Sequence, residues 1–286
     1  MADKKDLPAH IQAQLASAGR ETDTGGQPWK GRDLGEGTSH THQYPRDDGR
    51  TPAELADALK RFSRGEAPEE FVVDAMAGIR LFAPVLAELS QSHITETGLV
   101  SDKESDMALV SIQAPDGRKA LPVFSNVDAL TSWHEKARPV AADSRKIALS
   151  AVEDENQMLV LNPGTDLTFV VRRPAMWAIA KGKRWRPAYS DPAVLEALQE
   201  CGVAEPNIAT VNMAPGRGVG CRDADGHILP GGGPGPELSI ELSIRPGLDQ
   251  QELDDVVQGF QNRFSTHEIL AERVDSADIR LRAASA

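Results

Sequence analysis

The stretch GRKALPVFSNVDALTSWHEKA (Gly117–Ala137) decides the fold class, because it passes from strand spacing to helix spacing without a break. An apolar run also precedes it, so that two runs flank the dipeptide Asp116–Gly117, whose positive φ angles suit the twist of a β-hairpin. After the second run, apolar residues recur on one side at helical spacing, namely Val127, Leu130, Trp133 and Ala137. The sequence therefore predicts a hairpin followed directly by a helix, which is typical of an α+β protein.

The segment upstream of this stretch predicts a helix and then a strand. The helix of TPAELADALKRF has Thr51 as its expected N-cap, Pro52 in its first turn and Glu54 completing a capping box. The apolar segment at residues 78–89 is predicted as a buried strand, which Pro84 either interrupts or confines to a sheet edge. An exposed edge there would allow a homodimer to form by strand pairing.

The two ends of the chain differ in composition. Residues 1–50 are polar with few aliphatic side chains, so they bury too little apolar surface to offset the entropy of ordering. They are predicted to be a disordered tail. Downstream of the linker RWRPAYS, the order helix, strand, strand, helix predicts a small α+β layer, whose two strands are joined by a glycine-rich connector at residues 214–236.

Composition argues against several classes of protein. No run approaches the ~20 apolar residues that span a bilayer, so no membrane insertion is expected. The N-terminus lacks the apolar stretch of a secretory signal, and the cytoplasm is the expected location. Two cysteines, Cys201 and Cys221, are too few for a disulfide framework or a four-ligand zinc site. We expect no metal and no cofactor.

The charge balance argues against general nucleic-acid binding. The chain has 43 acidic and 31 basic residues, a formal net charge of -12, which repels phosphate backbones. The exception is AKGKRWRPA, in which Lys181, Lys183, Arg184 and Arg186 surround Trp185. Because cations are favoured at a helix C-terminus, a solvated helix end is the preferred interpretation of this cluster, and nucleic-acid binding is the alternative.

Ser125 and Asn126 form the first candidate site. They lie where the strand gives way to a helix N-terminus, whose free N–H groups can hold an anion. No glycine-rich cradle accompanies them, so a plain helix cap is the preferred interpretation and an anion site is the alternative.

Cys221 and Arg222 form the second candidate site, in a glycine-rich loop. Arg217 and Arg222 would lower the pKa of the thiol and favour a nucleophilic thiolate, as in a sulfurtransferase. Asp223 and Asp225 oppose that shift, and the loop is equally well interpreted as a turn. An inert thiol is the preferred interpretation.

Several stretches together resemble the actinobacterial SseB-like proteins, named for the enhanced serine sensitivity protein SseB. They are PWKGR, DDGRTPAELADAL, DGRKALPVFSNVDALTSW, LVLNPG, PGLDQQELDDVV and ERVDSADIRL. The resemblance implies an α+β N-terminal domain at residues 51–182, with a mixed sheet flanked by helices, and a smaller α+β C-terminal domain at residues 186–286. It implies no established reaction, cofactor or catalytic residue.

The function expected from these observations is that of a non-enzymatic binding or interaction module. Caps, turns and apolar periods account for nearly all the unusual residues, so no polar cluster remains that requires chemistry. The partner is expected to be an unidentified protein or small molecule. A thiol-dependent enzyme using Cys221 is the alternative.

Overall fold

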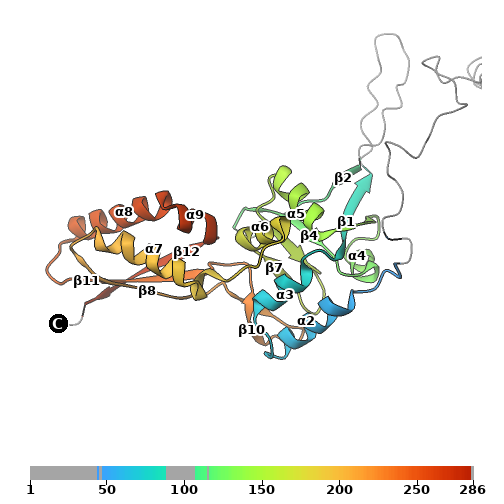
Figure 1. Cartoon of the computed structure of the whole chain (residues 1–286), viewed down its shortest axis with the longest axis horizontal. Coiled ribbons are helices and arrows are strands. Elements are labelled where there is room, and N and C mark those ends of the chain that lie inside the picture. Colours follow the sequence, from blue (N-terminus) through green and yellow to red (C-terminus); the bar gives the residue numbers. More distant parts are fainter. Residues whose placement is uncertain (1–43, 45–46, 88–106, 115, 285–286) are drawn as a thin grey trace, which may run out of the picture. The chain divides into compact units, whose positions relative to one another are not determined.

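The structure is a computed structural model that describes residue 44 and residues 47–87, 107–114 and 116–284. Helices and strands are both abundant among them, which confirms the α+β class (Figure 1). The chain after residue 45 forms one compact unit. None of the described helices is both long enough and apolar enough to cross a membrane.

The first half of this unit contains two sheets and the helices packed on them. Its described elements are α2 (Ala53–Ser63), α3 (Glu69–Met76), β1 (Arg80–Ala87), β2 (Met107–Leu109), β3 (Ile112–Gln113), β4 (Lys119–Val123), α4 (Val127–Trp133), β5 (Arg138–Asp143), α5 (Ser144–Glu153), β6 (Met158–Leu161), β7 (Phe169–Val171) and α6 (Arg173–Lys181). One sheet has the order β3-β4-β6-β7 and is mixed, because β4 and β6 run parallel. The other, β2-β1-β5, is antiparallel and meets the first at a bridge between Phe82 and Phe124.

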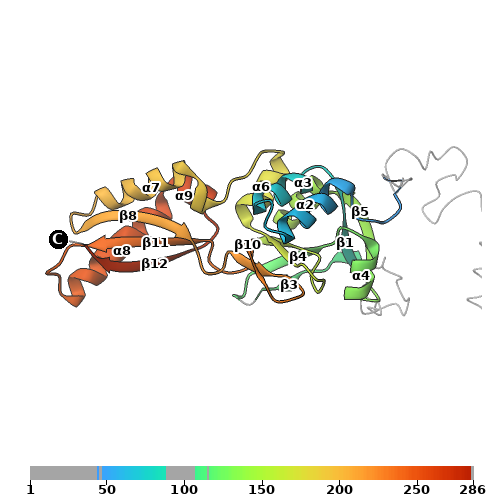
Figure 2. The ribbon, with the colours of Figure 1, turned by 90° about the horizontal axis from the view of Figure 1, so that it is seen from below.

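Helices α2, α3, α5 and α6 bury their apolar faces in one core with β4, β6 and β7 (Figure 2). Leu55 of α2, Val72 of α3 and Ile147 of α5 are among the buried side chains of this core. Burying a side chain of this size stabilises the fold by about 1.5–3 kcal/mol. The predicted mixed sheet flanked by helices is therefore confirmed.

The hairpin and the helix predicted from the central stretch are both present. Strands β3 and β4 pair antiparallel, and Gly117 in the turn adopts a φ of +88°. Asn126 is the N-cap of α4, and its side-chain oxygen accepts a hydrogen bond of 2.8 Å from the N–H of Ala129. The helix ends before Ala137, which nevertheless lies in the same apolar cluster as Leu130.

Two predictions for the upstream segment are wrong. Helix α2 has Pro52 as its N-cap and no side-chain cap, because the Thr51 hydroxyl lies instead 2.9 Å from that of Ser125. Strand β1 is the central strand of its sheet and pairs with β2 and β5, so it is not the edge strand at which a homodimer was expected to form. Residues 88 and 89 of the predicted strand lie outside the described residues. Pro84 faces Pro139 on β5, so neither residue of this pair has an N–H to donate, and its carbonyl accepts a hydrogen bond of 3.2 Å from the N–H of Val110, just beyond the last residue pair with β2.

Most of the predicted tail, residues 1–43 with 45 and 46, lies outside the described residues. Residues 47–50, in contrast, contact the folded body. The carboxylate of Asp47 lies 2.7 Å from the buried guanidinium of Arg80, and the Gly49 carbonyl accepts a hydrogen bond of 2.9 Å from the N–H of Val127. Contacts with the folded body are therefore made by residues that precede α2.

The second half of the unit is built on a sheet of order β12-β11-β8. Its described elements are η1 (Ala188–Ser190), α7 (Pro192–Val203), β8 (Ile208–Pro215), β9 (Gly220–Arg222), β10 (Ile228–Gly232), β11 (Leu238–Ile244), α8 (Gln250–Thr266), α9 (Glu268–Arg273) and β12 (Ala277–Ala283). Alternate residues of the central strand β11, such as Ile240 and Leu242, are buried in one core with Leu198 of α7 and Phe260 of α8. The predicted α+β layer is present.

The glycine-rich connector is more structured than predicted, because residues 220–232 form a hairpin of β9 and β10. Cys221 and Leu229 of this hairpin join the core of the first half. Gly232 has a φ of +64°, and a Cβ there would lie 2.5 Å from the ring of Phe169. Only glycine allows so close an approach at this φ.

Candidate functional site

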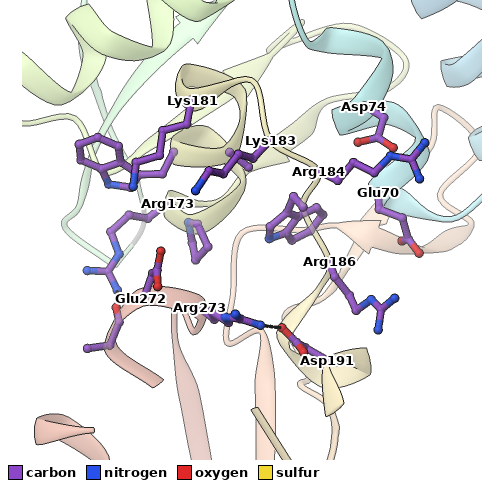
Figure 3. A pocket seen from close by; sticks show the side chains of 15 residues that line it. Glu70, Asp74, Arg173, Lys181, Lys183, Arg184, Arg186, Asp191, Glu272 and Arg273 are labelled. Carbon is purple, nitrogen blue, oxygen red and sulfur yellow. Dashed lines mark hydrogen bonds and ion pairs between the residues drawn. The ribbon is translucent and has the colours of Figure 1, made fainter. Parts of the chain in front are cut away.

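A cleft of about 700 Å³ lies among α3, α6, α9 and the connector between α6 and η1 (Figure 3). Helix α6 contributes Arg173, Trp177 and Lys181, which are spaced four residues apart and therefore share one face. Helix α3 contributes Glu70 and Asp74 at the same spacing. Two helix faces thus form opposite walls, which Figure 3 shows with Arg173 and Lys181 on one side and Glu70 and Asp74 on the other.

The connector supplies a further four residues to the lining, Lys183, Arg184, Trp185 and Arg186. Helix α6 ends at Gly182, which adopts the left-handed conformation (φ +61°) typical of a helix C-cap. The turn at this glycine brings the residues that follow it back around the cleft. The sequence predicted that four cations, Lys181, Lys183, Arg184 and Arg186, lie at a helix end. Only Lys181 lies in the last turn of α6, so the attraction of cations to a helix C-terminus accounts for Lys181 alone.

The cleft is more basic than acidic, although the whole chain is acidic. Six of its lining residues are lysine or arginine and four are aspartate or glutamate. One pair is neutralised internally, since Arg273 of α9 lies 2.9 Å from the carboxylate of Asp191 (dashed in Figure 3). Arg173 is held in place by donating to the carbonyls of Ala271 at 3.2 Å and Val274 at 3.0 Å.

Four cations of the cleft, Lys181, Lys183, Arg184 and Arg186, have no carboxylate within 4.0 Å in the part of the chain that the structure describes. The ammonium of Lys181 lies 5.2 Å from the ring centre of Trp177, a cation–π distance, and this indole is 37% exposed. The N–H of the second indole, Trp185, is buried and has no acceptor among the described residues. The cleft therefore combines unpaired positive charge with aromatic surface.

A buried ionic seam, formed by Glu69, Arg172, Glu237 and Asp275, lies beside the cleft in sequence: Glu69 begins α3 and Arg172 is the N-cap of α6. Each of its side chains is no more than 2% exposed. The guanidinium of Arg172 donates to the carbonyls of Gly235 (2.7 Å) and Gly218 (3.1 Å) and lies 3.6 Å from Asp275. Asp275 also accepts hydrogen bonds from Arg118 at 2.9 and 3.1 Å. Arg118 directly precedes β4 and Arg172 directly follows β7. Their contacts therefore connect both strands to Asp275, which lies just before β12.

The two glutamates of the seam are fully hydrogen bonded. Glu69 accepts from the Tyr189 hydroxyl and from the N–H of Gly232, both at 2.7 Å. Glu237 accepts from the N–H of Ala188 at 2.9 Å and from that of Asp275 at 3.1 Å. Burial raises the pKa of both carboxyl groups above the usual value of 4.5. Every carboxylate oxygen of the seam therefore has a hydrogen-bond partner among the described residues.

Ser125 and Asn126 are occupied by protein groups. Ser125 is 1% exposed, its N–H donates to the side-chain oxygen of Asn162 at 2.8 Å, and its hydroxyl accepts from the amide of the same residue at 3.0 Å. Asn126 caps α4, which is only seven residues long. The geometry supports the helix-cap interpretation over an anion site.

Cys221 and Arg222 point to opposite sides of β9, as successive residues of a strand do. Cys221 is buried, and burial, together with Glu69 and Asp223, raises the pKa of its thiol to about 11. Arg222 is exposed and donates to the carbonyl of Gly226 at 3.0 Å. This environment disfavours a thiolate and gives no support to the sulfurtransferase alternative.

Among the described residues, one group of side chains could share a cation, because its ligand atoms all lie within 4.8 Å of one another. This group is Asp223, Asp225 and His227. They occupy the turn between β9 and β10, and the Asp223 carboxylate accepts from the His227 backbone N–H at 2.8 Å. The group is largely solvent-exposed, and its bonds are those of a turn.

Sequence reasoning found the cations of the connector and Trp185 but missed the other walls of the cleft. Glu70 and Asp74 precede the connector by more than a hundred residues, and Arg273 follows it by more than eighty. The face of α6 offered a local signal, because Arg173, Trp177 and Lys181 recur at helical spacing. Nothing in the sequence indicated that this face meets α3 and α9.

Comparisons with known proteins identify one part of the chain. No curated protein and no solved structure matches it. Residues 55–178, from α2 into α6, match the family described as the SseB protein N-terminal domain. The match confirms the expected resemblance over the first half of the compact unit. Residues 55–178 therefore belong to the family of the SseB protein N-terminal domain.

Proposed function

We propose that this protein is a non-enzymatic binding module that holds an anionic ligand in the cleft beside α6. The observation that carries the proposal is a set of cations around two tryptophans, none of them with a carboxylate partner among the described residues, in a chain whose net charge is -12. Several cations gathered in one concave site raise the local positive potential, which favours an anion from solution.

The composition of the lining supports binding rather than covalent catalysis. The described lining residues of the cleft include no serine, threonine, cysteine or histidine, so hydroxyl, thiol and imidazole chemistry has no group there; the ionisable side chains of the lining are carboxylates, lysines and arginines. Arg173 is held by two carbonyls, so part of the site is already arranged before a ligand arrives. Such preorganisation reduces the entropy lost on binding.

The size of the cleft indicates a small ligand. A volume of about 700 Å³ falls in the range of small-molecule sites, about 300–1,000 Å³. The acidic side chains of the opposite wall, Glu70 and Asp74, would repel a long polyanion. We therefore extend the proposal to a small molecule and not to nucleic acid.

The location and the domain organisation belong to the same proposal. We place the protein in the cytoplasm, with domains at residues 51–182 and 186–286 separated near Gly182. Limited proteolysis of the full chain tests the boundary. Early cleavage between residues 182 and 187 supports it, and early cleavage elsewhere in residues 51–286 contradicts it.

The test of the ligand class uses pyrophosphate and isothermal titration calorimetry on the full chain. We expect binding at low salt that weakens at high salt, because the attraction is electrostatic. Lys183→Glu should abolish it. Lys136→Glu is the matched control, since Lys136 is an exposed lysine outside the cleft and its reversal changes the net charge equally.

Equal loss of pyrophosphate binding in both variants would show that only net charge matters and would contradict the proposal. Absence of binding in the wild type at low salt would contradict it directly.

A further inference from the structure

We infer that the ligand of the cleft is a nucleoside phosphate, an inference that rests on the proposed anion-binding function. The reason is that the cleft combines three kinds of group, namely cations, an exposed aromatic face and carboxylates. A bare inorganic anion needs only the first kind. A nucleoside phosphate uses all three, through its phosphates, its base and its ribose hydroxyls.

The phosphate end fits the basic side of the cleft. Lys181, Lys183 and Arg173 gather there, as Figure 3 shows. Ionised donors make shorter and stronger hydrogen bonds to phosphate oxygens than neutral donors do. Both hydrogen bonds of Arg173 to the carbonyls of Ala271 and Val274 use Nη2, so among the described residues its other terminal nitrogen, Nη1, has no acceptor. That nitrogen can donate to a phosphate beside the two ammonium groups.

The base fits the exposed indole of Trp177. This ring lies on the same face of α6 as Arg173 and Lys181 and is 37% exposed, so an aromatic ligand can reach it. Bases stack on such rings with little dependence on their identity. The ammonium of Lys181 lies 5.2 Å from the ring centre, so one side chain is positioned to contact both the base platform and a phosphate.

The carboxylates of the lining complete the argument against a longer ligand. Glu272 lies near Arg173 in Figure 3, and Glu70 and Asp74 lie across the cleft. Carboxylates accept hydrogen bonds from ribose hydroxyls and from exocyclic amino groups. They also repel additional phosphates, which disfavours a polynucleotide.

The experiment compares four probes by calorimetry on the full chain: ADP, adenosine, pyrophosphate and a single-stranded oligonucleotide. We expect ADP to bind about tenfold more tightly than pyrophosphate, which is within the contribution of one stacked base. Trp177→Leu should bring the affinity for ADP down to that for pyrophosphate and leave pyrophosphate binding unchanged.

Phe71→Leu is the matched control for the loss of an aromatic ring. Phe71 is 36% exposed and lies 4.6 Å below the guanidinium of Arg61, so it copies the cation–π arrangement of Trp177 but lies outside the cleft. This variant should bind ADP as the wild type does. Far-ultraviolet circular dichroism checks that both variants are folded.

Each alternative outcome overturns the inference in a distinguishable way. If pyrophosphate binds and ADP binds no more tightly, the nucleoside is wrong and the anion site stands. If adenosine binds as tightly as ADP, the phosphates have no role. If the oligonucleotide binds most tightly, the ligand is a nucleic acid. If none of the probes binds, the inference and the proposed function both fail.

Discussion

Replacing Arg172 with methionine tests whether the buried ionic seam holds the compact unit together. The substitution removes a fully buried guanidinium that donates to the carbonyls of Gly235 and Gly218 and faces Asp275. Methionine fills much of the same space but supplies no donor. Asp275 keeps its hydrogen bonds from Arg118, so its charge is not left alone.

The expected loss follows from these contacts. Removing one partner of a buried ion pair typically costs about 3–5 kcal/mol. The value for Arg172→Met should lie toward the lower end, because Arg118 stays and because the carbonyl of Gly218 still accepts from the N–H of Gly235 at 3.1 Å. For a folded unit of this size, such a loss lowers the melting temperature by roughly 6–20 °C.

Equilibrium unfolding in urea measures the loss directly. The midpoint should fall while the slope of free energy against denaturant stays unchanged. Arg280→Met is the control, because the Arg280–Asp278 pair is 46% and 25% exposed and should contribute less than about 1 kcal/mol. Arg172→Lys, which keeps the charge but loses the two-pronged donor, covers the case in which the methionine variant does not fold.

If Arg172→Met were as stable as the control variant Arg280→Met, the reasoning would be refuted. It would mean that the desolvation cost of the buried charge already cancels its contacts.

Three further predictions concern single residues. Glu69→Gln should become more stable relative to the wild type as pH rises from 4 to 7. The raised pKa of Glu69 in the folded wild type contributes stability that is complete below pH 4.5. This contribution is lost as pH rises through the folded pKa, by up to about 1.4 kcal/mol per pH unit. Alkylation of Cys221 by iodoacetamide at pH 8, located by peptide mapping, should be on the order of 100-fold slower in the folded than in the unfolded chain, because the folded pKa is about 11. Gly232→Ala should lower the free energy of unfolding, measured by thermal unfolding, by about 2–4 kcal/mol, because the new Cβ strains the backbone and contacts Phe169. Gly226→Ala should cost only about 1–2 kcal/mol, because Gly226 also has a left-handed backbone conformation but has open space around it.

Each of these has a clear contrary result. Parallel stability profiles for Glu69→Gln and the wild type would show that this carboxyl does not titrate differently on folding. Rapid alkylation of Cys221 in the folded chain would revive the thiol-dependent alternative. Equal losses for the two glycine variants would show that the ring of Phe169 yields without cost.

The local elements of this fold were predictable because their signals are short-range. The turn at Asp116–Gly117, the cap at Asn126 and the helical spacing of Leu130 each depend on a few neighbouring residues. The errors arose where distant residues decide. Thr51 occupies the position expected of a helix N-cap. Its hydroxyl, however, is hydrogen bonded to the hydroxyl of Ser125, 74 positions away, instead of to an N–H group of α2.

The candidate site was only partly predictable for the same reason. The basic run that begins at Lys181 was visible, but a solvated helix end was its preferred interpretation. Only the contacts of α6 with other helices make the run one wall of a cleft. The buried seam was invisible in the sequence, because Glu69, Arg172 and Asp275 look like ordinary surface charges until the fold removes them from water.

Neighbouring positions at the N-terminal ends of α3 and α6 have opposite roles. Glu69 and Arg172 are buried in the seam, whereas Glu70 and Arg173, one residue further along, line the cleft. Selection can therefore alter the chemistry of the open face while the anchoring charge beside it stays untouched. A substitution that changes the charge of the cleft at Glu70 or Arg173 therefore leaves the buried charges of the seam in place.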